Sequence, residues 1–335
     1  MLTHGAALVW SVQLRRPEAL AIIFTGPERV EVRQERLPRP RRGDLVLEAR
    51  CSLVSTGTER TCLTRDFAPG THWDAWVTYP FQPGYSFVGV TEAGARMCAH
   101  APHAQRAIVE EQRLIPVPDG ISDADASWFA LASIAQIGIA AAGIAPGDSV
   151  VVLGAGVLGQ LVAQLARTAG AGSVTVVARA RPRLDVALAH GASHVVAADA
   201  AGAREEVLAR IGGEGAAVVF DVTGSEPAFA DALKLARRFG TVVLLGDPGH
   251  PEEQRLAPEL LLNGLRVVGA YFEHSDLAGR RRMAEEFFAA VADGSVVVSD
   301  LITQRARPQD APALYASLSE EDPARLGVLF DWSLA

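Results

Sequence analysis

The spacing of apolar and polar residues changes character near residue 143. Before that point, short β-rich runs are separated by Pro and Gly, as in AIIFTGPERVEVRQE, DLVLEARCSLVSTG and PGYSFVGVTEAG. Runs of this length and composition, bounded by turn residues, predict strands. The first part of the chain is therefore expected to form a mostly β lobe.

After residue 143, apolar strands alternate with helical patterns. The predicted strands are SVVVLGA, SVTVVA, AAVVFDVTG and TVVLLG, and the predicted helices are VLGQLVAQLARTAGA, LDVALAHGA and EPAFADALKLARRFG. Each connection between parallel strands needs a crossover, so this alternation predicts a doubly wound parallel sheet with helices on both faces. The fold class is α/β, with a β-rich lobe followed by a Rossmann lobe.

Length and composition narrow the possible functions. A chain of 335 residues favours two domains with a cleft between them. The net charge of −8 leaves no basic surplus to hold a phosphate backbone, which excludes nucleic acid as a partner. The chain has the cysteines Cys51, Cys62 and Cys98, and no two of them form a CxxC pair. This spacing excludes a disulfide framework and a thiolate zinc cluster. It favours the reducing cytoplasm as the location of the protein.

No segment has the character of a membrane span or a secretory signal. The longest apolar stretches have the length of strands, well below the ~20 residues that a spanning helix requires. Residues 1–18 contain an apolar run, but no basic segment precedes it and no small-residue cleavage site closes it. We interpret residues 1–18 as a loosely attached N-terminal extension or as an over-long translation start.

A glycine-rich turn joins the first predicted strand of the second lobe to its first helix. It reads Gly154-Ala-Gly156-Val157-Leu158-Gly159. In this strand–turn–helix context the glycines allow a tight turn and close approach of a pyrophosphate, and the helix N-terminus favours its negative charge. The turn predicts a dinucleotide site; the alternative is a glycine turn in another kind of doubly wound protein.

The end of the second strand of this lobe bears on which dinucleotide binds. Ala178 stands 24 residues after Gly154, where an NAD-specific enzyme usually carries an acidic residue. Arg179 follows at once, and Arg183 lies one helical turn further, so guanidinium groups are available for a 2′-phosphate. We expect NADPH to be preferred over NADH. The alternative is that these arginines only form a solvated helix start.

Several motifs together resemble the medium-chain dehydrogenase/reductase superfamily, from residue 19 to the C-terminus. PGYSFVG at residues 83–89 is similar to the family's PGHEFVG segment, and Gly57-Thr58-Glu59 is similar to GTD in its CGTDxH segment. APGD followed by VVVLGAGVLGQ resembles the start of its cofactor domain, and DVTGS resembles the strand end that borders the nicotinamide.

The resemblance implies a domain organisation. A GroES-like catalytic domain would occupy residues 19–142, completed by residues 275–335, and a Rossmann domain would occupy residues 143–274. Thr223 and Gly246, at the ends of two later strands, would border the cofactor. The resemblance also implies an NAD(P)-dependent enzyme that acts on a small-molecule substrate as a homodimer.

The departures from the family pattern concern its catalytic zinc. At the three ligand positions of the family this chain has Thr56, Tyr85 and Ala130, and Ser86 replaces the glutamate of GHE. Hydroxyls and a methyl group cannot supply the thiolate, imidazole or carboxylate ligands that zinc prefers, so no zinc is expected. The structural zinc loop is also missing, because residues 94–107 carry only Cys98.

Without zinc, hydroxyl groups must stabilise the alkoxide and supply the proton. The resemblance places Thr58 at the position of the hydroxyl that relays protons in the family. It places Thr56 and Tyr85 at two positions that bind zinc in the family. Tyr85 is the best candidate for the general acid, because its phenol can donate to an oxyanion. The alternatives are that Tyr85 only satisfies a backbone group and that the threonines bond the local backbone.

An aromatic segment is the candidate substrate wall. In relatives this loop borders the substrate, and here it carries His72, Trp73, Trp76 and Tyr79. The segment could equally be a packed flap at an oligomer contact. His103 is a further polar candidate, although a lone histidine is more often structural, and Glu59 and Asp221 are expected to support local geometry.

Three functions remain open from the sequence. The first is NADPH-linked interconversion of a ketone and a secondary alcohol on a specialised metabolite, because SLVSTGTER and PGYS resemble a zinc-free branch that includes 3-hydroxyethyl bacteriochlorophyllide dehydrogenases. The second is reduction of an activated double bond, as in quinone and enoyl reductases. The third is dinucleotide binding without turnover.

Overall fold

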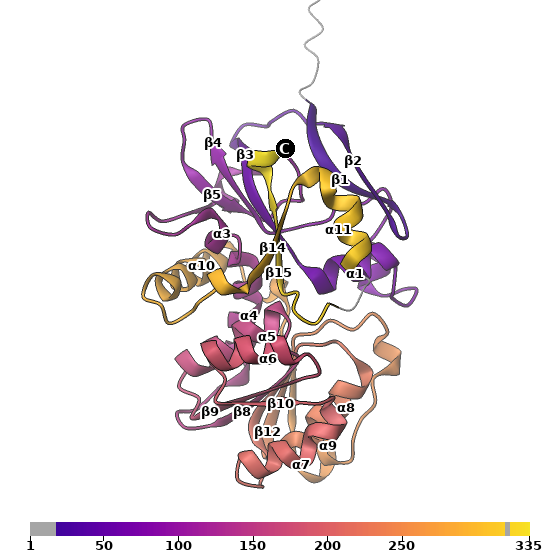
Figure 1. The fold of residues 1–335 in the computed structure, drawn as a ribbon, viewed down its shortest axis with the longest axis vertical. Coiled ribbons are helices and arrows are strands. Elements are labelled where there is room, and N and C mark those ends of the chain that lie inside the picture. The colour runs from indigo at the N-terminus through magenta and orange to yellow at the C-terminus, as the bar shows by residue number, and fades with distance from the viewer. Residues whose placement is uncertain (1–17, 319–321) are drawn as a thin grey trace, which may run out of the picture.

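A computed structural model describes residues 18–318 and 322–335 of the chain. Figure 1 shows two lobes, with the N-terminal and C-terminal segments together in the upper one and the middle of the chain in the lower one. The extension expected at residues 1–18 falls almost entirely outside the described residues, because the first described element begins at Glu18.

The upper lobe is built on β-strands. Its main sheet has the order β14-β15-β3-β4-β5-β7, β6 pairs with β3, and β1 and β2 form a separate hairpin. The strands are β1 (Glu18–Gly26), β2 (Arg29–Arg36), β3 (Asp44–Val54), β4 (Phe87–Thr91), β5 (Arg96–Ala99), β6 (Arg106–Glu110), β7 (Ile115–Pro116), β14 (Ile302–Ala306) and β15 (Gly327–Asp331). The short helices of this lobe are α1 (Thr56–Thr64), α2 (His72–Trp76), α3 (Asp123–Ala126) and α11 (Ala311–Leu318).

The C-terminal segment becomes part of the upper sheet. β15 runs antiparallel to β3, which aligns Phe330 with Ser52, and β14 lies parallel to β15. Because the chain returns in this way, residues near position 330 lie directly beside residues near position 52.

The lower lobe is a six-stranded parallel sheet with the order β10-β9-β8-β11-β12-β13. Its strands are β8 (Ser149–Leu153), β9 (Ser173–Ala178), β10 (His194–Ala197), β11 (Ala216–Asp221), β12 (Ala236–Leu244) and β13 (Arg266–Gly269). Its helices are α5 (Val157–Thr168), α6 (Arg181–His190), α7 (Ala200–Arg210), α8 (Glu226–Leu235) and α9 (Glu259–Leu262). Two further helices, α4 (Phe129–Ala142) and α10 (Leu277–Ala292), pack against each other.

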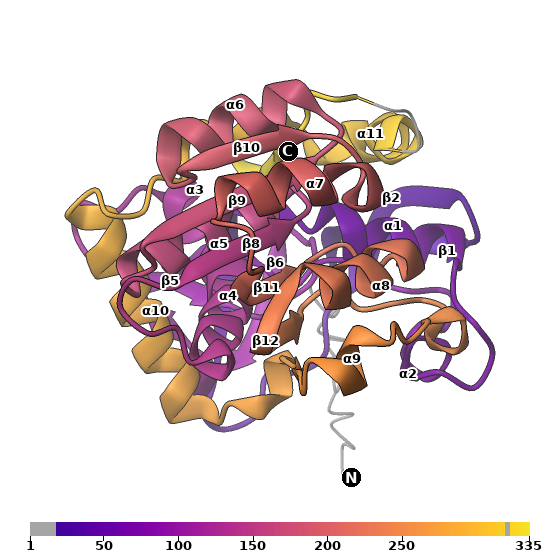
Figure 2. The same ribbon diagram turned by 90° about the horizontal axis from the view of Figure 1, so that it is seen from below.

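Alternating side chains of β8 explain why helices cover both faces of this sheet. Val150 and Val152 join a core cluster with residues of α4, α5 and α10, whereas Val151 and Leu153 join a second cluster with residues of α7 and α8. Figure 2 shows α4 and α10 on one side of the sheet and α8 and α9 on the other. The α/β class with a β-rich lobe and a Rossmann lobe is confirmed.

The boundary between α8 and β12 differs from the prediction. The sequence pattern predicts a helix through residue 240, but α8 ends at Leu235 and β12 begins at Ala236. The pairing of β11 with β12 skips from Ala236 to Thr241, and Phe239 in the skipped segment has φ +59°. An outward bulge with exposed side chains therefore replaces the last predicted helical turn.

The strand order places the glycine turn where ligands usually bind. The sheet extends from β8 to β9 on one side and to β11 on the other, so the connections leave in opposite directions at the end of β8. Open parallel sheets bind ligands at such a switch point, outside the carboxyl ends of the strands. Across the described ranges, no helix has the length and apolar character needed to cross a membrane.

Candidate functional site

The glycine turn after β8 has the geometry of a phosphate cradle. Gly154 has φ +109°, and a Cβ on Gly159 would lie 2.0 Å from the Gly154 carbonyl oxygen, so both positions require glycine. A Cβ on Gly156, the N-cap of α5, would meet no atom within 4 Å, which leaves space beside the backbone. Val157 and Leu158 begin α5, whose N-terminus can receive an anion.

The loops after β11 and β12 close over this turn. The Thr223 hydroxyl donates to the Asp221 carboxylate at 2.7 Å, and the Leu245 and Gly246 amides donate to the Asp221 carbonyl. A Cβ on Gly246 would lie 2.1 Å from the Gly224 nitrogen, so only glycine fits there. Asp221 orders this edge, and burial raises the pKa of its carboxyl group.

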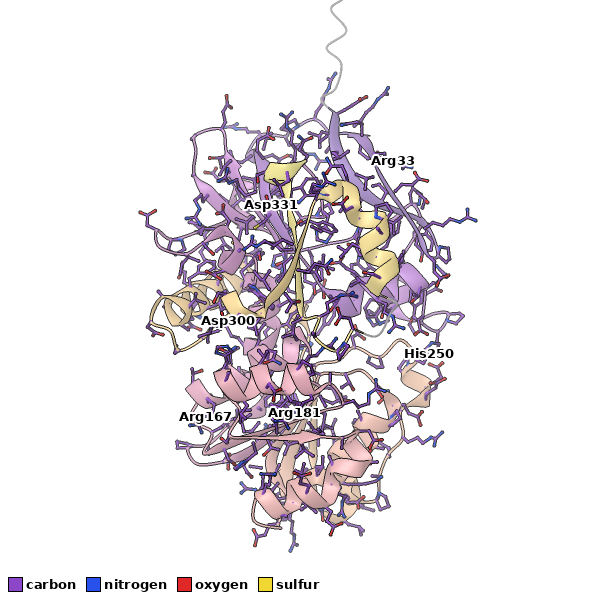
Figure 3. The ribbon with its side chains drawn as sticks, in the orientation of Figure 1. Arg33, Arg167, Arg181, His250, Asp300 and Asp331 are labelled. Atoms are coloured by element: carbon purple, nitrogen blue, oxygen red, sulfur yellow. The ribbon has the colours of Figure 1, made fainter. Side chains whose placement is uncertain are left out.

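The arginines after β9 differ in what holds them. Arg181 pairs with Asp185 at 2.8 Å, and Figure 3 labels it at the start of α6. The Arg183 guanidinium donates to the Asp322 carbonyl oxygen at 2.9 Å. Arg179 is exposed, and no hydrogen bond or ion pair within the described ranges engages its guanidinium. Arg179 is therefore the arginine best placed to meet a ligand, and Arg183 as a cofactor contact stays a prediction.

Three hydroxyl groups meet where α1 follows β3. The Tyr85 hydroxyl donates to the Ser55 side-chain oxygen at 2.7 Å, and Thr58, in the first turn of α1, is close enough to lower the pKa of Tyr85. Thr56 starts the helix beside Ser55. The partners of Tyr85 are side chains, so its hydroxyl does more than satisfy a backbone group. Ser55 is absent from the sequence predictions; its place as the residue before Thr56 was the available signal.

The surroundings of Tyr85 keep it protonated. Burial raises the pKa of Tyr85 to about 12, the Glu59 carboxylate contributes in the same direction, and hydrogen bonds with Ser55 and Thr58 oppose this shift. Since the usual phenol pKa is near 10, Tyr85 carries its proton throughout the neutral range. The residue can therefore act as a proton donor.

His103 is not positioned to contact a substrate, which corrects the prediction. Its side chain has no exposed surface. Nδ1 lies 2.7 Å from the Ser52 hydroxyl oxygen and Nε2 lies 3.1 Å from a Glu59 oxygen. The ring is enclosed by these partners because β3, α1 and the segment before β6 converge on it.

The aromatic segment around α2 is divided between the core and a contact between the lobes. Trp73 is buried beside Phe67, and the Tyr79 hydroxyl donates to the Cys62 carbonyl oxygen at 2.6 Å. These two side chains do not form an open wall. Trp76 is 49% exposed and remains a predicted substrate contact.

His72 and Trp73 connect the two lobes. The loop after β12 presents Asp247, whose oxygens lie 2.8 Å from His72 Nε2 and 3.3 Å from Trp73 Nε1. Nearby, the Ala68 amide donates to the Gly249 carbonyl, and Figure 3 labels His250 at the same boundary. The segment therefore packs as a flap, here between lobes of one chain, and His72 as a substrate contact stays a prediction.

The former zinc positions offer no set of metal ligands. Tyr85 is bonded to Ser55, and Ala130 is a buried residue of α4 with no donor atom. Within the described ranges, the one place where three His, Cys, Asp or Glu ligand atoms converge is the surface group His250, Glu252 and Glu253. The donors near Tyr85 do not fit zinc.

Comparisons with known proteins agree with this fold. Residues 157–291 match a family model described as "Zinc-binding dehydrogenase". A "Putative D-xylulose reductase" of Agrobacterium fabrum is 35% identical over 135 residues, which are 40% of this chain and 39% of that protein. The 2-desacetyl-2-hydroxyethyl bacteriochlorophyllide A dehydrogenase of Cereibacter sphaeroides is 25% identical over 93% of this chain and 98% of its own length.

Among solved structures, a "putative zinc-binding dehydrogenase" from Sinorhizobium meliloti 1021 bound to NADP superposes with a TM-score of 0.78. It shares 23% identity over 94% of this chain and 99% of that one, a likeness that supports the fold. The family-model match begins at α5, so it includes none of residues 56, 85 and 130.

Proposed function

Because this chain belongs to the medium-chain dehydrogenase/reductase superfamily, we propose that it is an NADP-linked, zinc-independent enzyme that interconverts a ketone and a secondary alcohol on a specialised metabolite. The observation that carries the proposal is the hydrogen-bonded pair of Tyr85 and Ser55. The resemblance aligns the protonated phenol of Tyr85 with the position at which the family has an imidazole zinc ligand. In this proposal a proton donor therefore takes the role of the Lewis acid.

The chain's own residues divide the work of binding and proton transfer. Gly154, Gly156 and Gly159 would hold the pyrophosphate, and Arg179 would meet the 2′-phosphate. The chemistry that NADPH would supply when bound is a hydride for the carbonyl carbon. Tyr85 donates its proton to the carbonyl oxygen, and the Ser55 and Thr58 hydroxyls stabilise the phenolate that remains.

Isotope transfer from NADPH labelled with deuterium at C4 tests the reaction. We would offer a panel of prochiral ketones together with matched α,β-unsaturated ketones and quinones. Deuterium on a carbinol carbon supports ketone reduction. Deuterium next to a retained carbonyl identifies a double-bond reductase, and binding of NADPH without transfer to any compound identifies a dinucleotide-binding protein; either result contradicts the proposal.

We expect the purified protein to contain no stoichiometric zinc and to keep its activity in chelator, because Thr56, Tyr85 and Ala130 cannot assemble a tetrahedral site. Metal analysis by mass spectrometry measures the content, and turnover before and after dialysis against a chelator measures the dependence. A zinc-dependent alcohol dehydrogenase treated in parallel is the control. About one zinc per chain, lost together with activity, would contradict this prediction.

An apolar patch at the edge of the lower sheet supports the expected homodimer. β13 is the last strand of the sheet, and the exposed fractions beside it are 86% for Leu261, 74% for Leu262 and 72% for Phe239. The Phe239 amide donates to the Asn263 carbonyl, and its ring approaches Gly264, so Phe239 lies beside the segment that directly follows Leu261 and Leu262. An unpaired edge strand beside apolar residues favours association with a second copy.

Light scattering at several concentrations tests this association. We expect the mass of a dimer for the native chain and a shift toward the monomer for Leu261→Glu/Leu262→Glu, because the added charges would be buried against the partner. Leu188→Glu, an exposed leucine on α6, is the matched control and should remain dimeric. A monomeric native chain at all concentrations contradicts the prediction.

A further inference from the structure

Glu59 and His103 are buried ionisable residues that the proposed reaction does not use. Their exposed fractions are 1% and 0%. An ionisable group is expensive to bury unless its hydrogen bonds are satisfied. The arrangement of their partners therefore indicates what the pair is for.

The Glu59 carboxylate accepts hydrogen bonds from three separate elements. The Ser55 amide donates to Oε1 at 2.8 Å, and His103 Nε2 and the Tyr315 hydroxyl both donate to Oε2. Tyr315 belongs to α11, at the far end of the chain. These donors hydrogen-bond both carboxylate oxygens, so the side chain of Glu59 is fixed in position.

The His103 ring is held through both of its nitrogens. Nε2 faces the Glu59 carboxylate and must carry a hydrogen. The Trp332 indole, which can only donate, lies 2.9 Å from the Ser52 hydroxyl oxygen, and the same oxygen lies 2.7 Å from His103 Nδ1. Both ring nitrogens of His103 therefore have buried polar partners, and the ring is fixed between Ser52 and Glu59.

The pair joins the two segments that carry the hydroxyl groups of the site. The His103 amide donates to the Pro83 carbonyl at 2.9 Å, and a Cβ on Gly84, which has φ +96°, would lie 2.7 Å from the His103 ring. The ring thus packs directly against the turn that presents Tyr85. At the other end, Glu59 bonds the amide of Ser55, whose hydroxyl accepts from Tyr85.

Resting on the function proposed above, we propose that Glu59 and His103 are positioning residues for the proton donor, with Glu59 fixing Ser55 and His103 fixing the turn of Tyr85. The buried contact between the Glu59 carboxylate and the His103 imidazole then fixes the distance between the Tyr85 and Ser55 hydroxyl oxygens. The Glu59 carboxylate also contributes, after burial, to raising the pKa of Tyr85, which favours retention of the phenol proton.

The other titratable groups that face Tyr85 within the described ranges are uncharged at neutral pH. Burial raises the pKa of the Cys62 thiol, which keeps it protonated. Burial lowers the pKa of the His100 ring, which lies near the Tyr85 backbone, to about 4. Ser55 and Thr58 do not titrate in this range, so Glu59 supplies the charge that acts on the phenol.

Titration of Tyr85 tests the proposal without any need for turnover. The chain has four tyrosines, and replacing them with the more acidic 3-fluorotyrosine gives resolvable ¹⁹F signals, of which Tyr85→Phe identifies one. We expect Glu59→Gln to move the Tyr85 midpoint to lower pH by about one unit, because the negative charge is gone. Glu48→Gln, which removes an exposed carboxylate on β3, is the control and should leave the midpoint unchanged. An unchanged midpoint in a folded Glu59→Gln protein overturns the proposal.

Two substitutions of His103 test the positioning with a separate readout. In His103→Gln the amide nitrogen can replace Nε2 and donate to Glu59, whereas His103→Phe removes both polar contacts. With NADPH and a ketone substrate, we expect kcat to fall about 10-fold or more in His103→Phe with little change in KM, and His103→Gln to recover most of it. Equal losses in both folded variants, or a loss confined to KM, contradict a positioning role.

These readouts separate failure of the inference from failure of the proposed function. A Tyr85 midpoint that responds to Glu59→Gln in a protein that reduces no ketone would leave the charge contact standing and remove the reaction. If the protein reduces ketones but the Tyr85 midpoint does not change in Glu59→Gln, the proposed reaction stands and the role of Glu59 is rejected. If His103→Phe does not fold, the Glu59→Gln titration and the His103→Gln rate still decide the question.

Discussion

Tyr85→Phe should lower the rate of the chemical step by about 100-fold or more, the usual scale for a general acid. The substitution removes one hydroxyl and keeps the ring, so folding and NADPH affinity should persist. The lost group is the donor of the 2.7 Å hydrogen bond to Ser55. Single-turnover reduction with deuterated NADPH measures the step directly, and an isotope effect establishes that hydride transfer limits the measured rate.

Ser55→Ala provides the paired variant for this experiment. If Tyr85 and Ser55 act through one hydrogen bond, the double variant should be no slower than Tyr85→Phe alone, because the second change removes nothing that still functions. Thr58→Val should cause a smaller loss than Tyr85→Phe, since water can replace a relay hydroxyl. Unchanged turnover in Tyr85→Phe would assign the proton to Ser55, Thr56 or a hydroxyl of the substrate.

The cofactor cradle could be predicted from the sequence because its geometry is local. The turn from Gly154 to Gly159 needs its glycines for a positive φ and for the contact between Gly159 and the Gly154 carbonyl, all within six residues. The alternation of β8, α5 and β9 is likewise encoded in consecutive residues. Local spacing was sufficient for these features.

The support beneath Tyr85 could not be predicted in this way. The Tyr315 bond to Glu59 spans 256 residues, and the Trp332 bond to Ser52 spans 280. Both depend on β15 pairing with β3, a contact that no local pattern specifies. For the same reason the sequence offers His103 as a polar candidate for the substrate site beside its structural alternative, whereas its hydrogen-bond partners are buried polar groups of the upper lobe.

The aromatic segment illustrates the same limit. Its composition suggests one apolar surface, but the fold sends Trp73 into the core and leaves Trp76 outside. The partner that draws His72 and Trp73 toward the lower lobe is Asp247, about 175 residues away. The roles of these side chains depend on contacts with the opposite lobe, and the sequence pattern of the segment carries no information about those contacts.

Arg179→Ala should weaken NADPH binding and leave NADH binding almost unchanged. The expected loss is about 5- to 150-fold, the range for a charge-assisted hydrogen bond of about 1 to 3 kcal/mol. The physical reason is that Arg179 is exposed directly after β9, beside Ala178, so a 2′-phosphate finds a guanidinium and meets no carboxylate at this position. Calorimetric titration of both dinucleotides at one ionic strength gives the two affinities.

Arg181→Ala is the matched control for this measurement. Arg181 lies two residues further along, but its guanidinium is already paired with Asp185 at 2.8 Å, so its removal should change NADPH affinity much less. Raising the salt concentration should reduce the native preference for NADPH and narrow the difference between the native chain and Arg179→Ala, because the contact is an exposed charge pair. Tighter binding of NADH than of NADPH by the native chain would show that these arginines form only the solvated start of α6.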